Sequence, residues 1–304
     1  MRQNQMGRTG LHVSELALGT FEWGRRVDAA TAQELLDAYA SAGGTLVELP
    51  AFDAPAVHLL GELRRPSRVA LAARVGVSSP GGTGRRYRTG RVDLLADVRT
   101  LLSGLGREHL EVLVLDAFDP SVPLEETASA LTVLAQRGDV GYVVASHHTA
   151  WQLALLSGFS GVPLAGAVAE YSLLRRDAEA DLQPALDHMG LGLIAGAGLG
   201  RGVLTGQYLK RMPRGSRAGG DFSAYVGELL DEDSTGIVQG AVKAATALGV
   251  SPVDIALAWN RQSAAASTLV SPRTRAHLDE LLASHLTLAP EIRDVLEQIS
   301  DPLR

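Results

Sequence analysis

The chain has 304 residues, of which 46% are hydrophobic, and its formal net charge is −6. The length and apolar content allow one large buried core, and the acidic balance argues against a partner as anionic as a nucleic acid. Cysteine is absent, which excludes disulfides, thiolate nucleophiles and cysteine-ligated metals.

Eight short apolar runs are spaced along the chain, with longer amphipathic segments between them. They cover residues 16–18, 45–48, 69–74, 110–116, 140–146, 166–170, 192–195 and 267–270. Runs of this length predict buried strands, and the periodic segments between them predict helices. Eight such units without a linker predict a single (β/α)8 TIM barrel domain over residues 1–304. A doubly wound sheet is the alternative, but no glycine-rich dinucleotide fingerprint follows the first run.

Capping signals predict where three of the helices begin. Thr31 followed by Glu34 has the pattern of a capping box. Pro123, followed by two acidic residues, opens a second helix, and Ser251 followed by Pro252 opens a third.

Two loops are expected on the catalytic face, at the carboxyl ends of the strands. Residues 78–89 follow the third strand and carry Arg85, Arg86 and Arg88, which are predicted to bind an anionic group of the substrate. Residues 196–234, after the seventh strand, form a segment too long for a simple connection, so we expect a lid or binding loop there.

Several motifs resemble those of bacterial aldo-keto reductases. They are residues 7–14 (GRTGLHVS), 18–20 with Trp23, 123–127 (PLEET), 170–179 (EYSLLRRDAE), 202–206 (GVLTG) with Tyr208, 251–252 with 256–259, and 273–274. The resemblance covers roughly residues 7 to 285. It implies a TIM barrel and, in ordinary members, NADPH-dependent reduction of carbonyls, with Trp23 on the substrate side.

The catalytic positions differ from those of ordinary members, which carry Asp, Tyr, Lys and His at the ends of strands two to four. Here these positions hold Glu48, Asp53, Arg74 and Asp116. The family tyrosine donates a proton to the carbonyl oxygen, whereas a carboxylate is normally ionised at neutral pH. A guanidinium in place of the lysine does not release its proton.

The resemblance also indicates which cofactor contacts remain. Ser146 is kept, but the family's nicotinamide-binding Asn and Gln are replaced by His147 and Val168, and residues 196–199 offer no aromatic ring. Toward the phosphates and adenine, residues at or near family binding positions are Leu199, Gly202, Thr205, Ser271, Arg273 and Glu280. NADPH binding is therefore compatible with the sequence but weakened.

From these residues we predict a non-redox acid–base catalyst. Glu48, Asp53 and Asp116 share one barrel mouth with Arg74 and His147, and neighbouring like charges raise one another's pKa. A protonated acid beside an ionised base suits dehydration, epimerisation, cyclisation or lyase-type cleavage of a small polar metabolite. No cofactor is favoured and no metal is predicted. Only two of the 28 basic residues are lysine, which indicates GC-rich coding and suggests bacterial secondary metabolism.

Two alternatives stay open. One is an NADPH-dependent carbonyl oxidoreductase with an atypical proton donor, and the other is a non-catalytic binding or regulatory subunit. The polar start and the absence of an apolar stretch of ~20 residues predict a cytoplasmic protein without a membrane partner. The sequence leaves the oligomeric state open.

Overall fold

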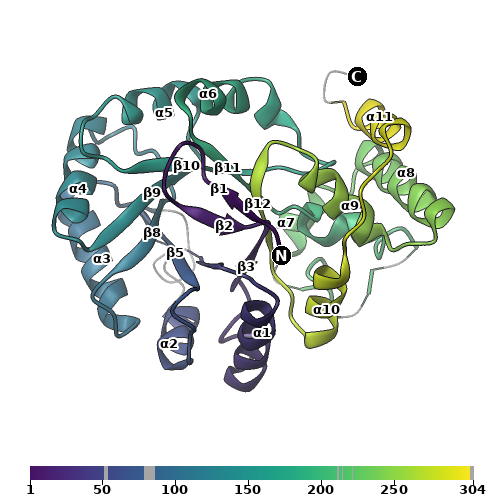
Figure 1. Cartoon of the computed structure of the whole chain (residues 1–304), viewed down its shortest axis with the longest axis horizontal. Coiled ribbons are helices and arrows are strands. Elements are labelled where there is room, and N and C mark those ends of the chain that lie inside the picture. The colour runs from purple at the N-terminus through teal and green to yellow at the C-terminus, as the bar shows by residue number, and fades with distance from the viewer. Residues whose placement is uncertain (51–53, 79–85, 211, 214, 221, 302–304) are drawn as a thin grey trace.

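The computed structural model describes residues 1–50, 54–78, 86–210, 212–213, 215–220 and 222–301. Its centre is a closed barrel of eight parallel strands (Figure 1), as predicted. In barrel order from the first, these are β3 (Leu16–Gly19), β4 (Leu46–Leu49), β5 (Ala70–Val75), β8 (Leu110–Leu115), β9 (Val140–Ser146), β10 (Leu164–Glu170), β11 (Gly192–Gly196) and β12 (Ala265–Val270). The strands match the predicted runs to within two residues.

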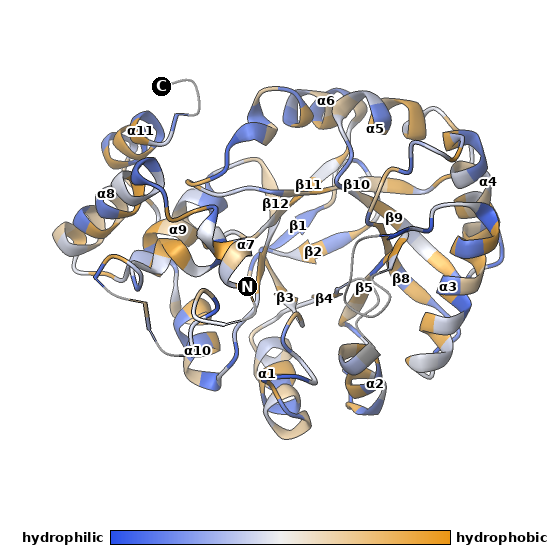
Figure 2. Cartoon of the chain, turned by 180° about the vertical axis from the view of Figure 1, so that it is seen from behind, coloured by the Kyte–Doolittle hydropathy of each residue, from blue (hydrophilic) through white to orange (hydrophobic). Residues whose placement is uncertain are grey.

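Helices surround the barrel and bury their apolar faces against it. Those that follow β3 to β10 are α1 (Ala29–Ser41), α2 (Ala54–Glu62), α3 (Arg91–Gly104), α4 (Leu124–Gln136), α5 (Ala150–Ser157) and α6 (Leu182–Met189). After β11 come α8 (Glu232–Leu248) and α9 (Pro252–Arg261), and after β12 come α10 (Arg275–Ala283) and α11 (Pro290–Ile299). In Figure 2 the strands β8 and β9 are largely orange, whereas the surrounding helices carry blue turns, as the barrel arrangement requires.

Two small antiparallel hairpins accompany the barrel and were not predicted. The first pairs β1 (Gln3–Gln5) with β2 (His12–Ser14), and its Met6, Leu11 and Val13 pack into the apolar barrel interior. The second pairs β6 (Val77–Ser78) with β7 (Arg86–Tyr87) beyond the end of β5. Strands of two or three residues are too short to show a period in the sequence.

The predicted helix starts are confirmed at two of the three positions. Ser251 and Asp254 form a capping box at the start of α9, and α4 begins at Leu124, directly after Pro123. The prediction that Thr31 caps the first helix is wrong. Asp28 is the N-cap of α1, and its side chain accepts a hydrogen bond from the Thr31 backbone N–H.

The segment after β11 is partly structured. A 3-10 helix, η3, spans Gly200–Thr205, and the short helix α7 spans Ser223–Gly227 before α8 begins at Glu232. Within the described ranges no single helix is long and apolar enough to cross a membrane, although the bent pair α8 and α9, at 102°, passes such a test by length and composition alone.

Candidate functional site

An ion cluster lies at the carboxyl ends of four barrel strands. Glu48 lies on β4, Arg74 on β5, Asp116 directly after β8, and Ser146 ends β9. The Arg74 guanidinium donates hydrogen bonds to the carboxylates of Glu48 and Asp116, and its Nη1 donates to Ser146 Oγ at 2.9 Å. The structure therefore brings together four of the predicted site residues, as expected for strand ends on one face of a barrel.

One guanidinium binds two carboxylates in this cluster. Burial by itself lowers the pKa of Arg74, but Glu48 and Asp116 outweigh it and hold that pKa above its ordinary value. The two carboxylates are only 7% and 4% exposed, so their attraction to the guanidinium acts in a medium that screens little. The expected repulsion between the two acids is thus opposed by a cation that bridges them.

His147 stands at the rim of the cluster. Its Nε2 lies 3.8 Å from Asp116 Oδ1, and 59% of its side chain is exposed. Its backbone φ is 57°, a left-handed conformation that non-glycine residues seldom adopt. An uncommon conformation that is held at a strand end is typical of a functional position. The imidazole is thus both paired with a buried carboxylate and open to a ligand.

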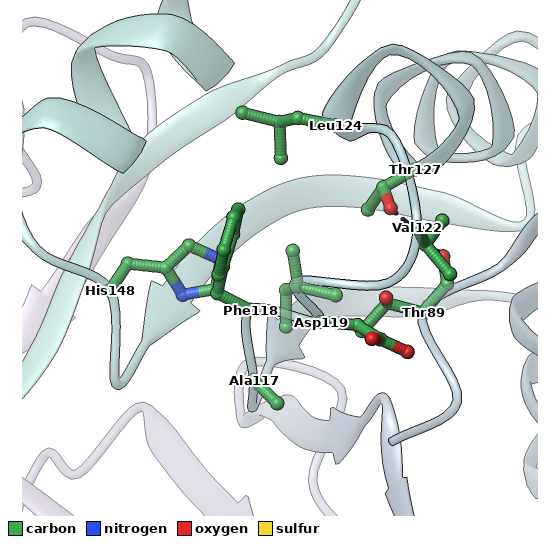
Figure 3. Close-up of a pocket in the computed structure, with 9 residues that line it drawn as sticks. Thr89, Ala117, Phe118, Asp119, Val122, Leu124, Thr127 and His148 are labelled. Atoms are coloured by element: carbon green, nitrogen blue, oxygen red, sulfur yellow. Dashed lines mark hydrogen bonds between the residues drawn. The ribbon is translucent and has the colours of Figure 1, made fainter.

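His148 points into a different environment. It lines a small pocket with Phe118 and Thr89 (Figure 3), and its ring lies edge-on to Phe118 at 6.2 Å between centroids. Its Nδ1 donates to the Ser146 carbonyl at 2.7 Å, and within the described part of the chain its buried Nε2 has no partner. Burial lowers its pKa, which keeps the ring neutral and separates its role from that of His147.

Four residues were predicted to contact the substrate, and the structure describes the surroundings of three of them. Trp23 is 1% exposed and packs in the apolar core, and its contact with a substrate stays a prediction. The Arg88 guanidinium is held by Asp97, at 2.7 Å, and by Asp93, at 3.0 Å, both on α3. These ion pairs connect the end of the second hairpin to α3, and the role of Arg88 in binding an anion stays a prediction. Arg86 is exposed on β7, while Arg85, like Asp53, lies outside the described residues.

The residues expected at the phosphate end of a dinucleotide lie on neighbouring loops. Leu199, Gly202 and Thr205 follow β11, whereas Ser271 and Arg273 follow β12. Glu280 is exposed on α10.

A buried glutamate that the sequence did not single out gathers three arginines at this end. Glu22 is 3% exposed, and its carboxylate lies 3.3 Å from Arg217, 3.6 Å from Arg26 and 4.0 Å from Arg273. Three guanidinium groups around one carboxylate leave an excess of positive charge, which suits a phosphate-bearing ligand. The phosphate end of a dinucleotide therefore fits these loops.

The nicotinamide end fits less well. Val168 is 6% exposed and packs in the barrel interior, where it offers no amide. Gly196 is buried, and a Cβ at this position would meet the Ala169 carbonyl at 3.2 Å and Val168 Cγ1 at 3.5 Å. Neither residue offers the pyridine ring a polar contact or an aromatic surface.

A second ion network joins the segment after β11 to the barrel. Arg201 of η3 donates from Nε and Nη2 to the two oxygens of Glu170, at 2.7 and 2.6 Å, and from Nη1 to Glu228 at 2.7 Å. Nothing in the spacing of these residues predicted the network, because it joins positions far apart in the chain.

Comparison with known proteins agrees with this architecture. The family model described as "Aldo/keto reductase family" matches residues 15–300. The chain is 27% identical to a probable voltage-gated potassium channel subunit beta of Oryza sativa, over 98% of this chain and 96% of the relative. It is also 27% identical to the uncharacterised oxidoreductase YrpG of Bacillus subtilis, with the same coverage of 98% and 96%. An L-glyceraldehyde 3-phosphate reductase of Escherichia coli is 28% identical, over 85% of this chain and 80% of the relative.

The family match extends from the first barrel strand to the last helix and takes in every strand of the closed barrel. The chain belongs to the aldo/keto reductase family.

Proposed function

We propose that this chain is a nicotinamide-dinucleotide-dependent oxidoreductase of a small carbonyl compound, in which His147 and Asp116 handle the proton. The observation that carries the proposal is the chain of contacts from Glu48 through Arg74 and Asp116 to His147. The family, and the reductase and oxidoreductase among its relatives, support the redox half.

Each residue of the cluster has a distinct task in this proposal. Arg74 fixes the Asp116 carboxylate through a hydrogen bond and a full opposite charge. Asp116 in turn orients the His147 imidazole and stabilises its protonated form, in the way that a buried carboxylate supports a general acid. The exposed imidazole then delivers a proton to the oxygen of the substrate, the task of the tyrosine in ordinary members.

The dinucleotide, when bound, would supply the reducing equivalent. Arg217, Arg273 and Arg26 are the residues placed to hold its phosphates, because Glu22 neutralises only one of their three charges. The nicotinamide end does not fit as well, so only the proton-transfer half of the reaction is assigned to residues of this chain.

A second candidate is favoured by that poor fit. Val168 and Gly196 provide no polar or aromatic contact for a nicotinamide ring. The same His147–Asp116 pair would then act in a non-redox reaction such as dehydration, epimerisation, cyclisation or lyase-type cleavage of a small polar metabolite.

Cofactor titration and turnover distinguish the two candidates. We expect quenching of protein fluorescence by NADPH at micromolar concentrations, and oxidation of NADPH with a panel of short aldehydes and α-dicarbonyls. His147→Gln should lower kcat by about 100-fold or more while the Kd for NADPH stays unchanged. His12→Gln is the matched control, because His12 is exposed on β2 in the hairpin that packs against the barrel interior, away from the ion cluster. Absence of NADPH binding would overturn the redox proposal in favour of the second candidate.

A further inference from the structure

The turn that carries His147 has an uncommon backbone conformation. His147 is one of three non-glycine residues with a positive φ in the part of the chain that the structure describes. A histidine adopts this left-handed conformation less readily than glycine does, so contacts of the neighbouring residues must maintain it. Those neighbours are Ser146, which ends β9, and His148, which precedes the start of α5 at Ala150.

His148 closes this turn. Its Nδ1 donates a hydrogen bond of 2.7 Å to the Ser146 carbonyl, so that the bond spans His147. A carbonyl oxygen can only accept, which places the ring proton on Nδ1. The side chain of Ser146 is fixed as well, because Arg74 Nη1 donates to its Oγ at 2.9 Å. Ser146 is thus tied to the Arg74 cluster by its side chain and to His148 by its backbone.

His148 is held in place by packing. Its ring is 7% exposed and lies edge-on to Phe118, at 6.2 Å between centroids (Figure 3). The same pocket is lined by Leu124 and Thr127 of α4. Phe118 belongs to the loop after β8, two residues beyond Asp116. The ring of His148 is thus fixed against the loop that carries the carboxylate partner of His147.

The position of the His147 imidazole depends on this turn. Its Nε2 lies 3.8 Å from Asp116 Oδ1 while the backbone φ is 57°. A change of φ to the ordinary negative range would rotate the Cα–Cβ bond and carry the imidazole away from that carboxylate. The hydrogen bond between His148 and Ser146 opposes this change, because the two residues that it joins flank His147 on either side.

We propose that His148 is a positioning residue, whose hydrogen bond to the Ser146 carbonyl holds the His147 imidazole against Asp116. Because its ring is buried, it acts through His147 and does not contact the substrate. The task of His147 as the proton donor rests on the proposed function. The Nε2 atom of His148, which has no hydrogen-bond partner among the described residues, has no part in this role.

Removal of the donor tests this role. His148→Phe keeps an aromatic ring in the pocket beside Phe118 and removes the unpartnered Nε2 together with the Nδ1 donor, so the protein should fold. With the best carbonyl substrate of the panel, kcat should fall about tenfold or more, because the proton donor is misplaced, while KM and the Kd for NADPH stay unchanged. His12→Phe is the matched control, because it removes the same kind of bond, from Nδ1 to the carbonyl two residues earlier, at 3.2 Å on β2. A wild-type kcat in His148→Phe would overturn the proposal.

A second variant separates positioning from packing. His148→Asn places an amide N–H where Nδ1 lies but leaves part of the pocket empty. It should therefore unfold at a lower temperature than His148→Phe and yet keep kcat within about threefold of the wild type. If the role of His148 were only structural, the less stable variant would also be the slower one. An asparagine variant as slow as His148→Phe would reject the hydrogen bond as the cause.

Crystal structures decide the case in which no carbonyl of the panel is reduced. In the wild type the His147 imidazole should lie beside the Asp116 carboxylate, as it does here at 3.8 Å. In His148→Phe the φ of His147 should leave the positive range, and the imidazole should no longer contact Asp116. Failure of turnover together with this displacement would reject the oxidoreductase and retain the positioning role. A His147 imidazole that stays against Asp116 in His148→Phe would reject the positioning role.

Discussion

Arg74 is the residue that allows two acidic side chains to remain buried in the barrel mouth. Both carboxylates bind its guanidinium, and its side chain is 14% exposed. Arg74→Met should lower the free energy of unfolding by about 3–5 kcal/mol, because it leaves two buried carboxylates without a cation. Arg74→Lys should cost less, since the charge is kept but only one of the two contacts can be made well. Urea denaturation measures both, and a methionine variant as stable as the wild type would contradict this account.

Asp116 and His147 should behave as one unit. Asp116→Asn keeps the shape of the side chain and removes the charge that orients and stabilises the imidazolium. We expect kcat to fall by about 10- to 100-fold in this variant and the double variant Asp116→Asn, His147→Gln to be no slower than His147→Gln alone. The double-mutant cycle on kcat checks this. Additive losses would show that the two residues act independently.

At the scale of the element, the hairpin β6–β7 is anchored to α3 by a buried ion pair. Asp97 is 4% exposed and accepts three hydrogen bonds from Arg88, at 2.7, 3.0 and 3.2 Å. Arg88→Met should therefore lower the free energy of unfolding by about 2–3 kcal/mol, since it leaves Asp97 buried without its cation. KM for the carbonyl substrate should not change. A raised KM without a loss of stability would instead indicate that Arg88 contacts the substrate.

Elements with strong local signals could be predicted from the sequence, and contacts between distant segments could not. The capping box at Ser251 and Asp254 is contained within four residues, so its pattern predicts α9 directly. The start of α1 was misplaced because Asp28 and Thr31 both offer a capping side chain, and only the backbone conformation shows which one is used.

Site residues at strand ends could be predicted from the sequence, whereas those in irregular segments could not. Glu48, Arg74 and Asp116 end predicted strands and His147 directly follows one, and the barrel brings the carboxyl ends of all strands to one face. Glu22 lies in a turn and Arg201 in the 3-10 helix η3, and no sequence period determines the path of either segment, so their ion contacts emerge only in three dimensions. The burial of Trp23 could not be predicted, because a motif position does not reveal whether a side chain points into the core or into the mouth.

At the scale of the whole molecule, buried tyrosines should limit stability at alkaline pH. Tyr39 joins α1 to the barrel, because its hydroxyl donates a hydrogen bond to the Leu16 carbonyl and accepts one from the Leu46 backbone N–H, and burial raises its pKa from 10.0 to about 12. Below the pKa of the unfolded chain this contribution is fully present, and it is lost as the pH rises from 10 to about 12. Burial also raises the pKa of Tyr171, which adds to the same loss.

Thermal unfolding as a function of pH measures this effect. The wild type should lose stability steeply in the alkaline window, and Tyr39→Phe should show a shallower decline from a lower starting stability. If the stability of Tyr39→Phe falls as steeply with rising pH as that of the wild type, the group that titrates is another residue.

On the acid side, the free energy of unfolding should fall as the pH drops below 6.5, the ordinary pKa of histidine. Burial is the main cause that lowers the pKa of His148 in the folded protein, so only the unfolded chain then binds the proton readily.

The central claim is that an imidazole supported by the Arg74 cluster has taken over proton transfer in an aldo/keto reductase barrel. The most direct measurement is kcat for NADPH-dependent reduction of a carbonyl substrate, for the wild type and for His147→Gln, from about pH 5 to about pH 9. The account predicts that the wild-type rate falls with the loss of one proton as the pH rises. It also predicts that the variant is slower by about 100-fold and has no such dependence. Equal rates and equal pH profiles in the two proteins would contradict it.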